Sequence, residues 1–461
     1  MSAAGAGVAA PARRIALGSG WVLGAVGLGL VYPASAYYVS PLALPLALAA
    51  LGLAAVTLSR PEVGIAVAIF LSALNPGLAG SLPWLPGTAW TAFVFLISVG
   101  KLGAERGWGH RLPPLGFVAL VFVAVDIVGL VLSESAGDGV PILRSAVTGV
   151  MLMFAIAAQV RTRRQAEWVV GGLVAGAALI GGYGTWQYLT GAPTSVGFLT
   201  ASGELISRAT AGFDQPNQLA GFLVLLVPFA LAGAIVNRRL RIVFVVAGAL
   251  AVVGVYASFS RAALVALAIT PLMFRGGRAL LLVVPVVAVL GIFATPTLVS
   301  ERFETLTAQG SEIATRTDFW RTAGDIWTRS PLAGAGLGEF PAAYAQSRVP
   351  GRQFLPASAF QPPPHAHNLE LQLLAEQGLL GLMAFLAVLG VAVSRGLALL
   401  RSHERWISVL GSAILAALAA FVIHNQFDVT LYEGTGVYFW AILGLLAALT
   451  IISSDERPAD A

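Results

Sequence analysis

The residues best suited to chemistry are two histidines that stand directly before a long apolar segment, in Pro362-Pro363-Pro364-His365-Ala366-His367-Asn368. The prolines end any preceding helix and favour an extended chain, so His367 and Asn368 are expected in the first turn of a helix near 368–394. The positive end of a helix disfavours a charged histidine. His367 is therefore predicted to be a neutral imidazole that can accept a proton as a general base. The structural alternative is a histidine that only caps the helix, and the spacing does not distinguish His367 from His365.

Three arginines form a second group of candidates, and their chemistry would be phosphate binding. Arg261 lies in Ser258-Phe259-Ser260-Arg261 between two very apolar segments, where an unpaired guanidinium is costly. Arg208 shortly precedes Pro216-Asn217, and Arg316 opens an amphipathic segment. A planar guanidinium suits phosphate oxygens, and several can share one diphosphate. For each arginine alone, contact with lipid headgroups is the simpler explanation, but three on the same side as His367 favour a functional site.

The acidic residues add one further candidate for the functional site. Asp428 follows His424-Asn425-Gln426-Phe427 in a predicted turn, where it could orient His367 or pair with an arginine; a solvated turn residue is the equal alternative. Asp126, near the middle of an early apolar segment, is interpreted as a structural hydrogen-bond partner, and Glu370 is expected on the helix face of His367. No metal site or cofactor is predicted, because the two histidines lack a third ligand at helical spacing.

Composition sets the class of protein that must hold these residues. Hydrophobic residues make up 57% of the 461 positions and charged residues only 11%, against about a quarter in soluble domains. Such a chain cannot cover a water-facing surface, so a single all-α membrane domain is predicted over residues 1–461. The absence of cysteine excludes disulfides and thiolate sites. The net charge of +5 comes from short basic clusters between apolar segments, which is typical of membrane proteins and not of nucleic-acid binding.

A membrane-spanning helix needs about 20 mostly apolar residues. By this criterion we predict about 12–14 transmembrane helices, near 17–33, 39–58, 62–78, 86–101, 114–133, 143–160, 166–188, 217–236, 241–258, 261–274, 279–297, 368–394, 406–424 and 434–452. The third and tenth of these segments are short or interrupted by Gly and Pro. Without these two segments, the predicted number of transmembrane helices is about twelve. The stretch Met1–Arg14 could begin a cleaved signal peptide, but the series of later spans favours an uncleaved first helix.

Basic residues mark alternate turns of this series. They are Arg13 and Arg14; Arg60; Lys101, Arg106 and Arg111; Arg161, Arg163 and Arg164; Arg238, Arg239 and Arg241; Arg275 and Arg278; Arg395, Arg401 and Arg405. Because cytoplasmic loops carry an excess of Lys and Arg, both termini are predicted to be cytoplasmic. His367 and the three candidate arginines then lie on the opposite, outer side.

Two outer segments are longer than a simple turn, namely 190–216 and 298–366. Within the second, apolar residues recur at helical spacing over Arg316–Arg329. They predict an amphipathic helix that lies on or near the membrane surface; the residues are Phe319, Trp320, Ala323, Ile326 and Trp327. The glycines of Gly334–Gly338 then indicate a flexible turn.

Four stretches together resemble the O-antigen ligase and O-antigen polymerase superfamily. They are His367-Asn368-x-x-Leu371-x-x-x-x-Glu376-x-Gly378-x-x-Gly381, the region from Arg208 to Asn217, Ser260-Arg261 after an apolar helix, and the segment Pro331–Phe340. They occur in the family's order within residues 190–440, whereas the earlier helices match only in hydrophobic character.

The resemblance implies a metal-independent membrane glycosyltransferase, without a cofactor, at the outer face of the bacterial inner membrane. Such enzymes transfer a glycan from undecaprenyl diphosphate to an acceptor hydroxyl. The implied partners are therefore the lipid-linked glycan, a lipid or glycan acceptor such as lipid A-core, and membrane lipids. Carried over by position, His367 would be the base or orient the acceptor, and Arg208 and Arg261 would hold the diphosphate. Arg316 would assist them. Beside these carried-over roles, Asp428, Asn368 and His365 are predicted as candidates that could orient the base or line the acceptor site.

Several activities are compatible with these residues. Within the superfamily, a polysaccharide polymerase or a protein O-oligosaccharyltransferase is the alternative to a ligase. From a different class, a polysaccharide transporter or flippase is the competing hypothesis. Transporters usually gather polar groups near the bilayer midplane, where Asp126 is nearly alone, so the sequence disfavours transport.

Overall fold

The computed structural model describes residues 43–78, 87–106, 113–134, 136–192, 194, 197–199, 205–274, 312–346, 365–432 and 434–455. The chain divides into two units, Met1–Arg60 and Pro61–Ala461. In the first unit the described residues form one helix, α2 (Ala43–Ser59). The functional candidates all belong to the second unit, which is described below.

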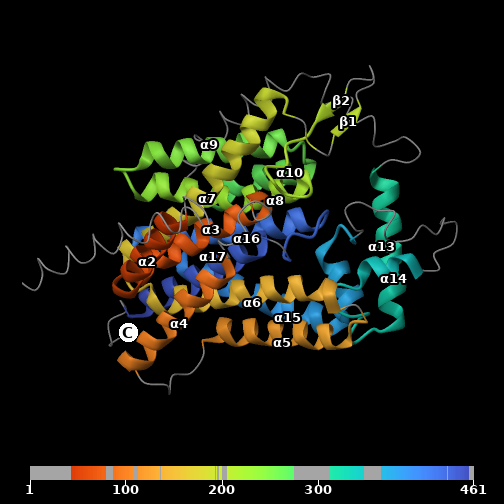
Figure 1. The fold of residues 1–461 in the computed structure, drawn as a ribbon, viewed down its shortest axis with the longest axis horizontal. Coiled ribbons are helices and arrows are strands. Elements are labelled where there is room, and N and C mark those ends of the chain that lie inside the picture. Colours follow the sequence, from red (N-terminus) through yellow and green to blue (C-terminus); the bar gives the residue numbers. More distant parts are fainter. Residues whose placement is uncertain are drawn as a thin grey trace, which may run out of the picture. The chain divides into compact units, whose positions relative to one another are not determined.

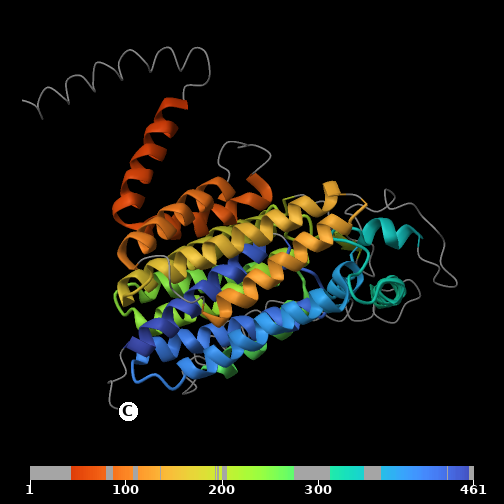
Figure 2. The same cartoon turned by 90° about the horizontal axis from the view of Figure 1, so that it is seen from below.

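The second unit is built from long apolar helices (Figures 1 and 2). Those that the structure describes are α3 (Pro61–Leu78), α4 (Gly87–Arg106), α5 (Pro114–Leu132), α6 (Ala136–Gln159), α7 (Arg163–Thr190), α8 (Pro216–Val236), α9 (Arg241–Ala257), α10 (Arg261–Ile269), α15 (Leu369–Leu399), α16 (Arg405–Asn425) and α17 (Gly434–Asp455). A short 3-10 helix, η1 (Thr270–Met273), continues α10. Among the described residues, eight helices are long and apolar enough to cross a membrane.

The predicted class, an all-α multi-pass membrane protein, is confirmed, since the described residues are mostly helical and include these eight apolar helices. Twelve of the fourteen predicted spans coincide with α2–α10 and α15–α17. The spans predicted near 17–33 and 279–297, and the stretch Met1–Arg14, lie outside the described residues.

A small hairpin departs from the prediction that the chain contains no strand. The strands β1 (Gly197–Leu199) and β2 (Leu205–Ser207) pair antiparallel, with Gly197 opposite Ser207. They lie in the segment 190–216, which is predicted to be an outer loop, and their backbone groups pair with each other. The second strand ends immediately before Arg208.

Helix α8 lies at the centre of the unit, because its sequence is apolar on every side. In this span 89% of the residues are buried, and the helix packs against α7, α9 and α16. Glycines allow the neighbouring helices to approach closely. A Cβ atom on Gly181 of α7 would lie 2.7 Å from the Leu250 carbonyl oxygen, and one on Gly254 of α9 would lie 3.0 Å from the Cα of Gly181.

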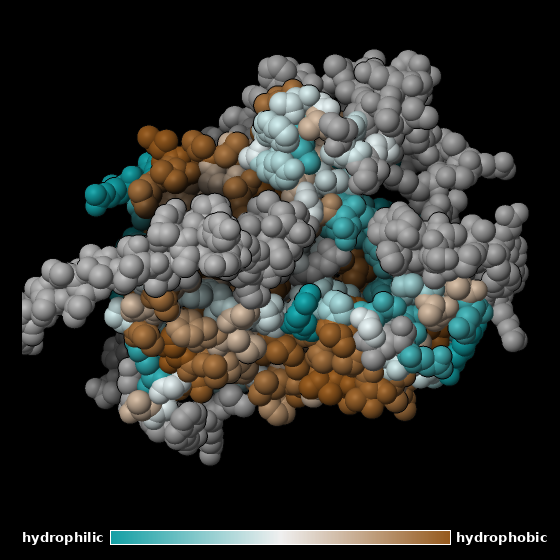
Figure 3. All heavy atoms as spheres, viewed as in Figure 1, coloured by the Kyte–Doolittle hydropathy of each residue, from teal (hydrophilic) through white to brown (hydrophobic). Residues whose placement is uncertain are grey.

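Helix α5 lies at the edge of the unit and exposes apolar side chains along its length (Figure 3). Phe117 is 60% exposed and Val131 is 78% exposed. A monomeric soluble protein does not leave such a continuous apolar face in water, so this face is suited to lipid. The opposite face of α5 packs against α6 and α15.

The basic turns and the functional candidates lie at opposite ends of the same helices. At one end, Arg163 Nη2 donates to the Val236 carbonyl at 3.2 Å, which joins the start of α7 to the end of α8. At the other end, α8 begins at Pro216, α10 at Arg261 and α15 at Leu369. A helix of 21 residues such as α8 is about 30 Å long, which separates the two ends by the thickness of a bilayer core.

The predicted surface helix is observed as α13 (Glu312–Arg329), followed by the short α14 (Phe340–Gln346). The position of α13 on or near the membrane surface stays a prediction, but part of its apolar side is covered by protein. Phe319, Ala323 and Ile326 are buried against residues of α14 and α15. The sequence periodicity correctly located the helix, but an apolar stripe can pack on protein as well as on lipid.

The segment after α13 forms backbone hydrogen bonds with α15 at a point where that helix is interrupted. Gly378, with φ 62° and ψ −155°, breaks the helix, and the segment 331–336 pairs with the break. The N–H groups of Leu379 and Leu380 donate to the carbonyls of Pro331 and Leu332 at 2.9 and 3.1 Å, while those of Ala335 and Gly336 donate to Ala375 and Glu376 at 2.8 and 2.9 Å. Buried backbone groups must be paired where water is absent, so this segment and α15 form one structural element.

The same segment also contacts α5. The Leu337 N–H donates to the Gly129 carbonyl at 2.9 Å, and Ser133 Oγ donates to Glu339 Oε1 at 2.6 Å. Glu376 Oε1 in turn accepts from the Phe340 N–H at 3.1 Å. The predicted flexible turn at 334–338 is thus held by α5 and α15, and it connects both helices to α13.

We predict that Gly378→Ala destabilises the protein by about 2 kcal/mol or more. An alanine would have to adopt a left-handed conformation, and its Cβ would lie 2.4 Å from the Leu332 carbonyl carbon. Thermal unfolding of the purified protein in detergent measures the change. The matched control is Gly390→Ala in the same helix, because a Cβ at Gly390 meets nothing within 4 Å. Equal melting temperatures for the two variants would contradict the prediction.

Candidate active site

The turn that carries Arg208 is fixed by buried hydrogen bonds from two helices. Gln187, near the end of α7, accepts from the N–H groups of Thr210 and Ala211 at 3.1 and 2.8 Å through its Oε1 atom. The Ala209 N–H donates to the Ala257 carbonyl of α9 at 3.0 Å. The backbone around Arg208 is therefore positioned by α7 and α9 before any ligand binds.

The guanidinium of Arg208 is buried and held in one orientation. Its Nε donates to the Ser258 carbonyl at 2.8 Å, and its Nη2 donates to Asn217 Oδ1 at 3.0 Å. Asn217 stands in the first turn of α8, and Ser258 directly follows α9. These bonds aim a permanent positive charge at the start of α8 and α10.

Arg208, Arg261 and Arg316 line one pocket, together with Asn217, Phe259, Ser260 and Ala262. Three residues far apart in the sequence thus meet at the same end of the helices. Several guanidiniums around one cavity suit an anion with several oxygens, and a diphosphate is such an anion.

Arg316 connects this pocket to the histidines. Its Cζ lies 5.9 Å from the centre of the Phe427 ring. One turn further along α13, Phe319 lies against His367 with 5.4 Å between the ring centres. His367 does not line the arginine pocket itself, but it is adjacent to the pocket through α13.

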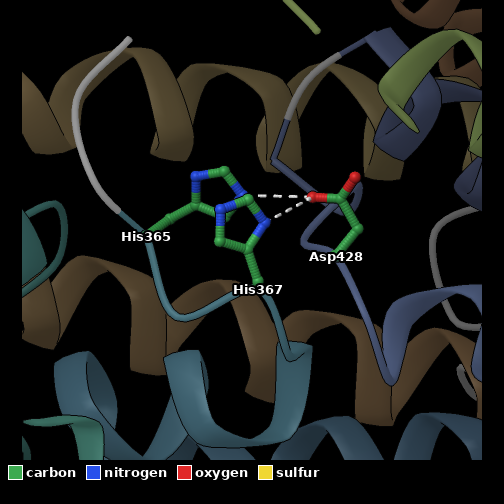
Figure 4. A group of neighbouring side chains, drawn as sticks. All are labelled: His365, His367 and Asp428. Carbon is green, nitrogen blue, oxygen red and sulfur yellow. Dashed lines mark hydrogen bonds and ion pairs between the residues drawn. The ribbon is translucent and has the colours of Figure 1, made fainter. Parts of the chain in front are cut away.

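Asp428 brings the two histidines together (Figure 4). His365 Nε2 lies 3.1 Å from Asp428 Oδ1, within hydrogen-bonding distance, and His367 Nδ1 lies 3.7 Å from the same oxygen. The two imidazole centres are 3.9 Å apart. Asp428 is fully buried, and its Oδ1 also accepts from the Val429 N–H at 2.8 Å. It is therefore not a solvated turn residue, and its shorter contact is with His365 and not with His367.

Burial and neighbouring charges set the protonation of this cluster. Burial lowers the pKa of His367, and His365 and Arg316 lower it further against the opposing effect of Asp428. Burial alone would raise the pKa of Asp428, but the hydrogen bond from His365 and the nearby His367 hold this pKa well below its usual range. His367 is thus a neutral imidazole beside an ionised carboxylate, which suits a proton acceptor.

The backbone at the site is constrained. His367, Phe259 and Ala211 are the non-glycine residues with positive φ in the described part of the chain, with values of 50°, 52° and 46°. All three adjoin the candidate residues, and such conformations are often found at functional sites. The helix begins at Leu369, and Asn368 caps it by accepting from the Leu371 N–H at 2.9 Å. His367 and Asn368 therefore precede the first turn in which they were predicted.

Other contacts were not foreseen from the sequence. Gln187 and Gln372 act on distant backbone, the latter by accepting from the Ala366 N–H at 2.7 Å. Gln426 donates to Glu370 Oε1 at 2.8 Å, so Glu370 serves the contact between α15 and α16. The sequence gives little indication of what a glutamine within an apolar span contacts, because its hydrogen-bond partner is decided by tertiary packing.

Asp126 belongs to a separate group deeper among the helices. It is fully buried in α5, and the amide of Gln377 and the carboxylate of Glu376 on α15 are its electrostatic neighbours. Gln377 Nε2 also donates to the Tyr432 hydroxyl at 3.2 Å. Asp126 thus lies apart from the histidines, and because neither of its buried carboxylate oxygens forms a hydrogen bond with the described residues, its role as a structural hydrogen-bond partner stays a prediction.

The described residues contain one group that could hold a metal ion, namely His365, His367 and Asp428, whose donor atoms lie within 4.8 Å of one another. The third ligand that the sequence spacing lacked is supplied from the turn after α16. The expectation of a metal-free site therefore stays a prediction.

We predict that Gln187→Leu destabilises the protein by about 1–3 kcal/mol, because two buried N–H groups lose their acceptor. Thermal unfolding measures the change. The control is Thr190→Val on the same helix, which removes only an exposed bond to the Trp186 carbonyl. A Gln187→Leu protein as stable as this control would contradict the role assigned to Gln187.

Comparison with known proteins identifies the region that holds most of the site. Residues 217–386 match the O-antigen ligase family, which confirms the resemblance to the ligase and polymerase superfamily. The matched region contains Arg261, Arg316 and both histidines, whereas Arg208 and Asp428 lie outside it. No curated protein gives a significant match to the chain.

Proposed function

We propose, from the O-antigen ligase match over residues 217–386, that this protein is a membrane glycosyltransferase that moves a glycan from undecaprenyl diphosphate to an acceptor hydroxyl. The observation that carries the proposal is the three-arginine pocket beside a neutral, carboxylate-linked imidazole. In this proposal, the acceptor is lipid A-core or a similar lipid. The reaction takes place at the outer face of the bacterial inner membrane, and both termini are cytoplasmic.

In the proposed reaction, the histidine cluster takes up a proton and the arginine pocket binds the negatively charged leaving group. The acceptor hydroxyl gives its proton to His367 while its oxygen bonds to the anomeric carbon of the donor sugar. The bond from that carbon to the diphosphate oxygen breaks, and the electron pair leaves with the lipid diphosphate. Arg208, Arg261 and Arg316 stabilise the negative charge that grows on the leaving group.

The nearby residues keep these groups in place. Asp428 holds the imidazole pair and favours the protonated histidine after transfer, as a carboxylate does for a catalytic histidine. Asn368 caps α15 and donates to the Gln426 carbonyl at 3.2 Å, which fixes the turn of Asp428 relative to His367. No nucleotide is needed, because the lipid diphosphate is itself a good leaving group.

We predict that His367→Ala lowers glycan transfer by about 100-fold or more, the usual contribution of a general base. Transfer is measured with purified protein, lipid-linked glycan and acceptor. The control is His403→Ala in the exposed turn between α15 and α16, which should leave the rate unchanged. Normal expression and melting temperature of His367→Ala must accompany the loss, and full activity would remove the proposed base.

The variant His365→Ala distinguishes the roles of the two histidines. If His367 is the base and His365 only positions Asp428, this variant should retain more transfer than His367→Ala. The reverse order would assign the base to His365, which makes the shorter contact with Asp428.

We predict that Arg261→Lys weakens binding of the lipid diphosphate and lowers turnover by about tenfold, since a point charge replaces a planar donor pair. Titration of undecaprenyl diphosphate into the purified protein measures the affinity. Arg395→Lys, an exposed residue at the opposite end of α15, is the matched control. Unchanged affinity in Arg261→Lys would contradict the diphosphate role.

Ligase and polymerase activities leave different products in cells. A deletion strain that accumulates long carrier-linked glycans beside a bare acceptor would support ligation. Acceptors that carry single repeat units would instead indicate that polymerisation is the reaction lost.

A further inference from the structure

The three groups around Asp428 converge as the ligands of a metal ion do. His365 Nε2 and His367 Nδ1 lie 3.1 and 3.7 Å from the same carboxylate oxygen, and both rings point toward it (Figure 4). The nitrogens around one zinc ion lie about 2.0–2.1 Å from it, and hence about 3.3 Å apart in a tetrahedral site. Small side-chain rotations would bring all three donors to such distances.

One of the three donor atoms lacks an ordinary partner. Among the described residues, His367 Nδ1 is buried and forms no hydrogen bond, and the second oxygen of the same carboxylate, Asp428 Oδ2, is also buried without one. Leaving such atoms unpaired is costly, and a cation between the three donors would give His367 Nδ1 a partner. Two neutral imidazoles and one carboxylate favour zinc and related transition metals over magnesium or calcium, which prefer sites made of oxygen.

The cluster is both held in place and open to an incoming ion. The Asp428 side chain is 1% exposed, whereas each histidine side chain is 18% exposed. Val429, Gln372 and the cap at Asn368 fix the backbone on both sides. An ion therefore finds three donors already close together, which reduces the ordering cost of binding.

We propose that His365, His367 and Asp428 bind one zinc-class divalent ion, and that this ion inhibits the enzyme. The inhibition rests on the proposed function, whereas the binding does not. Coordination through Nδ1 leaves the remaining ring proton of His367 on Nε2, so that the imidazole cannot accept another. The ion takes the place of the proton between His365 Nε2 and Asp428 Oδ1, and His365 then carries its one ring proton on Nδ1 after exchange with water. The nearby charge of Arg316 opposes binding, which makes the ion exchangeable and its effect reversible.

Binding is tested on the full-length protein, purified in detergent and stripped with EDTA. Isothermal titration with ZnCl2 should give one ion per chain, and Co2+ should give the visible absorption of a nitrogen- and oxygen-ligated site. Asp428→Asn and His365→Ala should each weaken zinc binding at least tenfold, while His403→Ala should bind as wild type does. Equal zinc affinity in Asp428→Asn and wild type would overturn the site.

Activity is tested separately with the same samples. Zinc should abolish glycan transfer at the concentrations at which it binds, and EDTA should restore it. Transfer that EDTA abolishes and zinc restores would overturn inhibition and make the ion a cofactor. Stoichiometric binding in a protein that transfers no glycan under any metal condition would support the site and contradict the proposed function, so the two failures are distinguishable.

Discussion

The constraint on which the site depends is the need to pair every backbone group inside an apolar bundle. Helix α15 breaks at Gly378, and the segment 331–336 supplies the donors and acceptors that the break removes. A broken helix is tolerated at membrane depth only where protein or water satisfies it. This pairing connects α13 to the start of α15, and it thereby brings Arg316 next to His367.

The charges of the site are arranged around one buried carboxylate and one arginine pocket. Asp428 contacts two imidazoles, while the three guanidiniums gather a short distance away. In the proposed reaction, this separation lets the imidazole accept a proton and the arginines bind an anion without neutralising each other. Arg316, next to both, also helps to keep His367 neutral. Electrostatic effects of this kind are strongest where water is excluded.

The polar residues inside the helix bundle connect helices, whereas those at its end include the functional candidates. Asp126, Gln377 and Tyr432 connect α5 and α15 to the turn before α17. Together with the contact of Leu337 with Gly129, they hold α5 and α15, which both contact the segment after α13. The functional candidates instead gather where α8, α10 and α15 begin, opposite the basic turns.

The sequence by itself determined the helical class and most spans, because apolar runs of bilayer length have few other structures. It also singled out His367 and the three arginines, since charged and titratable groups are conspicuous between apolar helices. Only the tertiary structure decided that Asp428 is buried and lies nearest His365, and that Phe319, Ala323 and Ile326 of α13 pack on α14 and α15. Those outcomes depend on contacts between residues that belong to different elements, such as His365 and Asp428, which local periodicity and spacing do not encode.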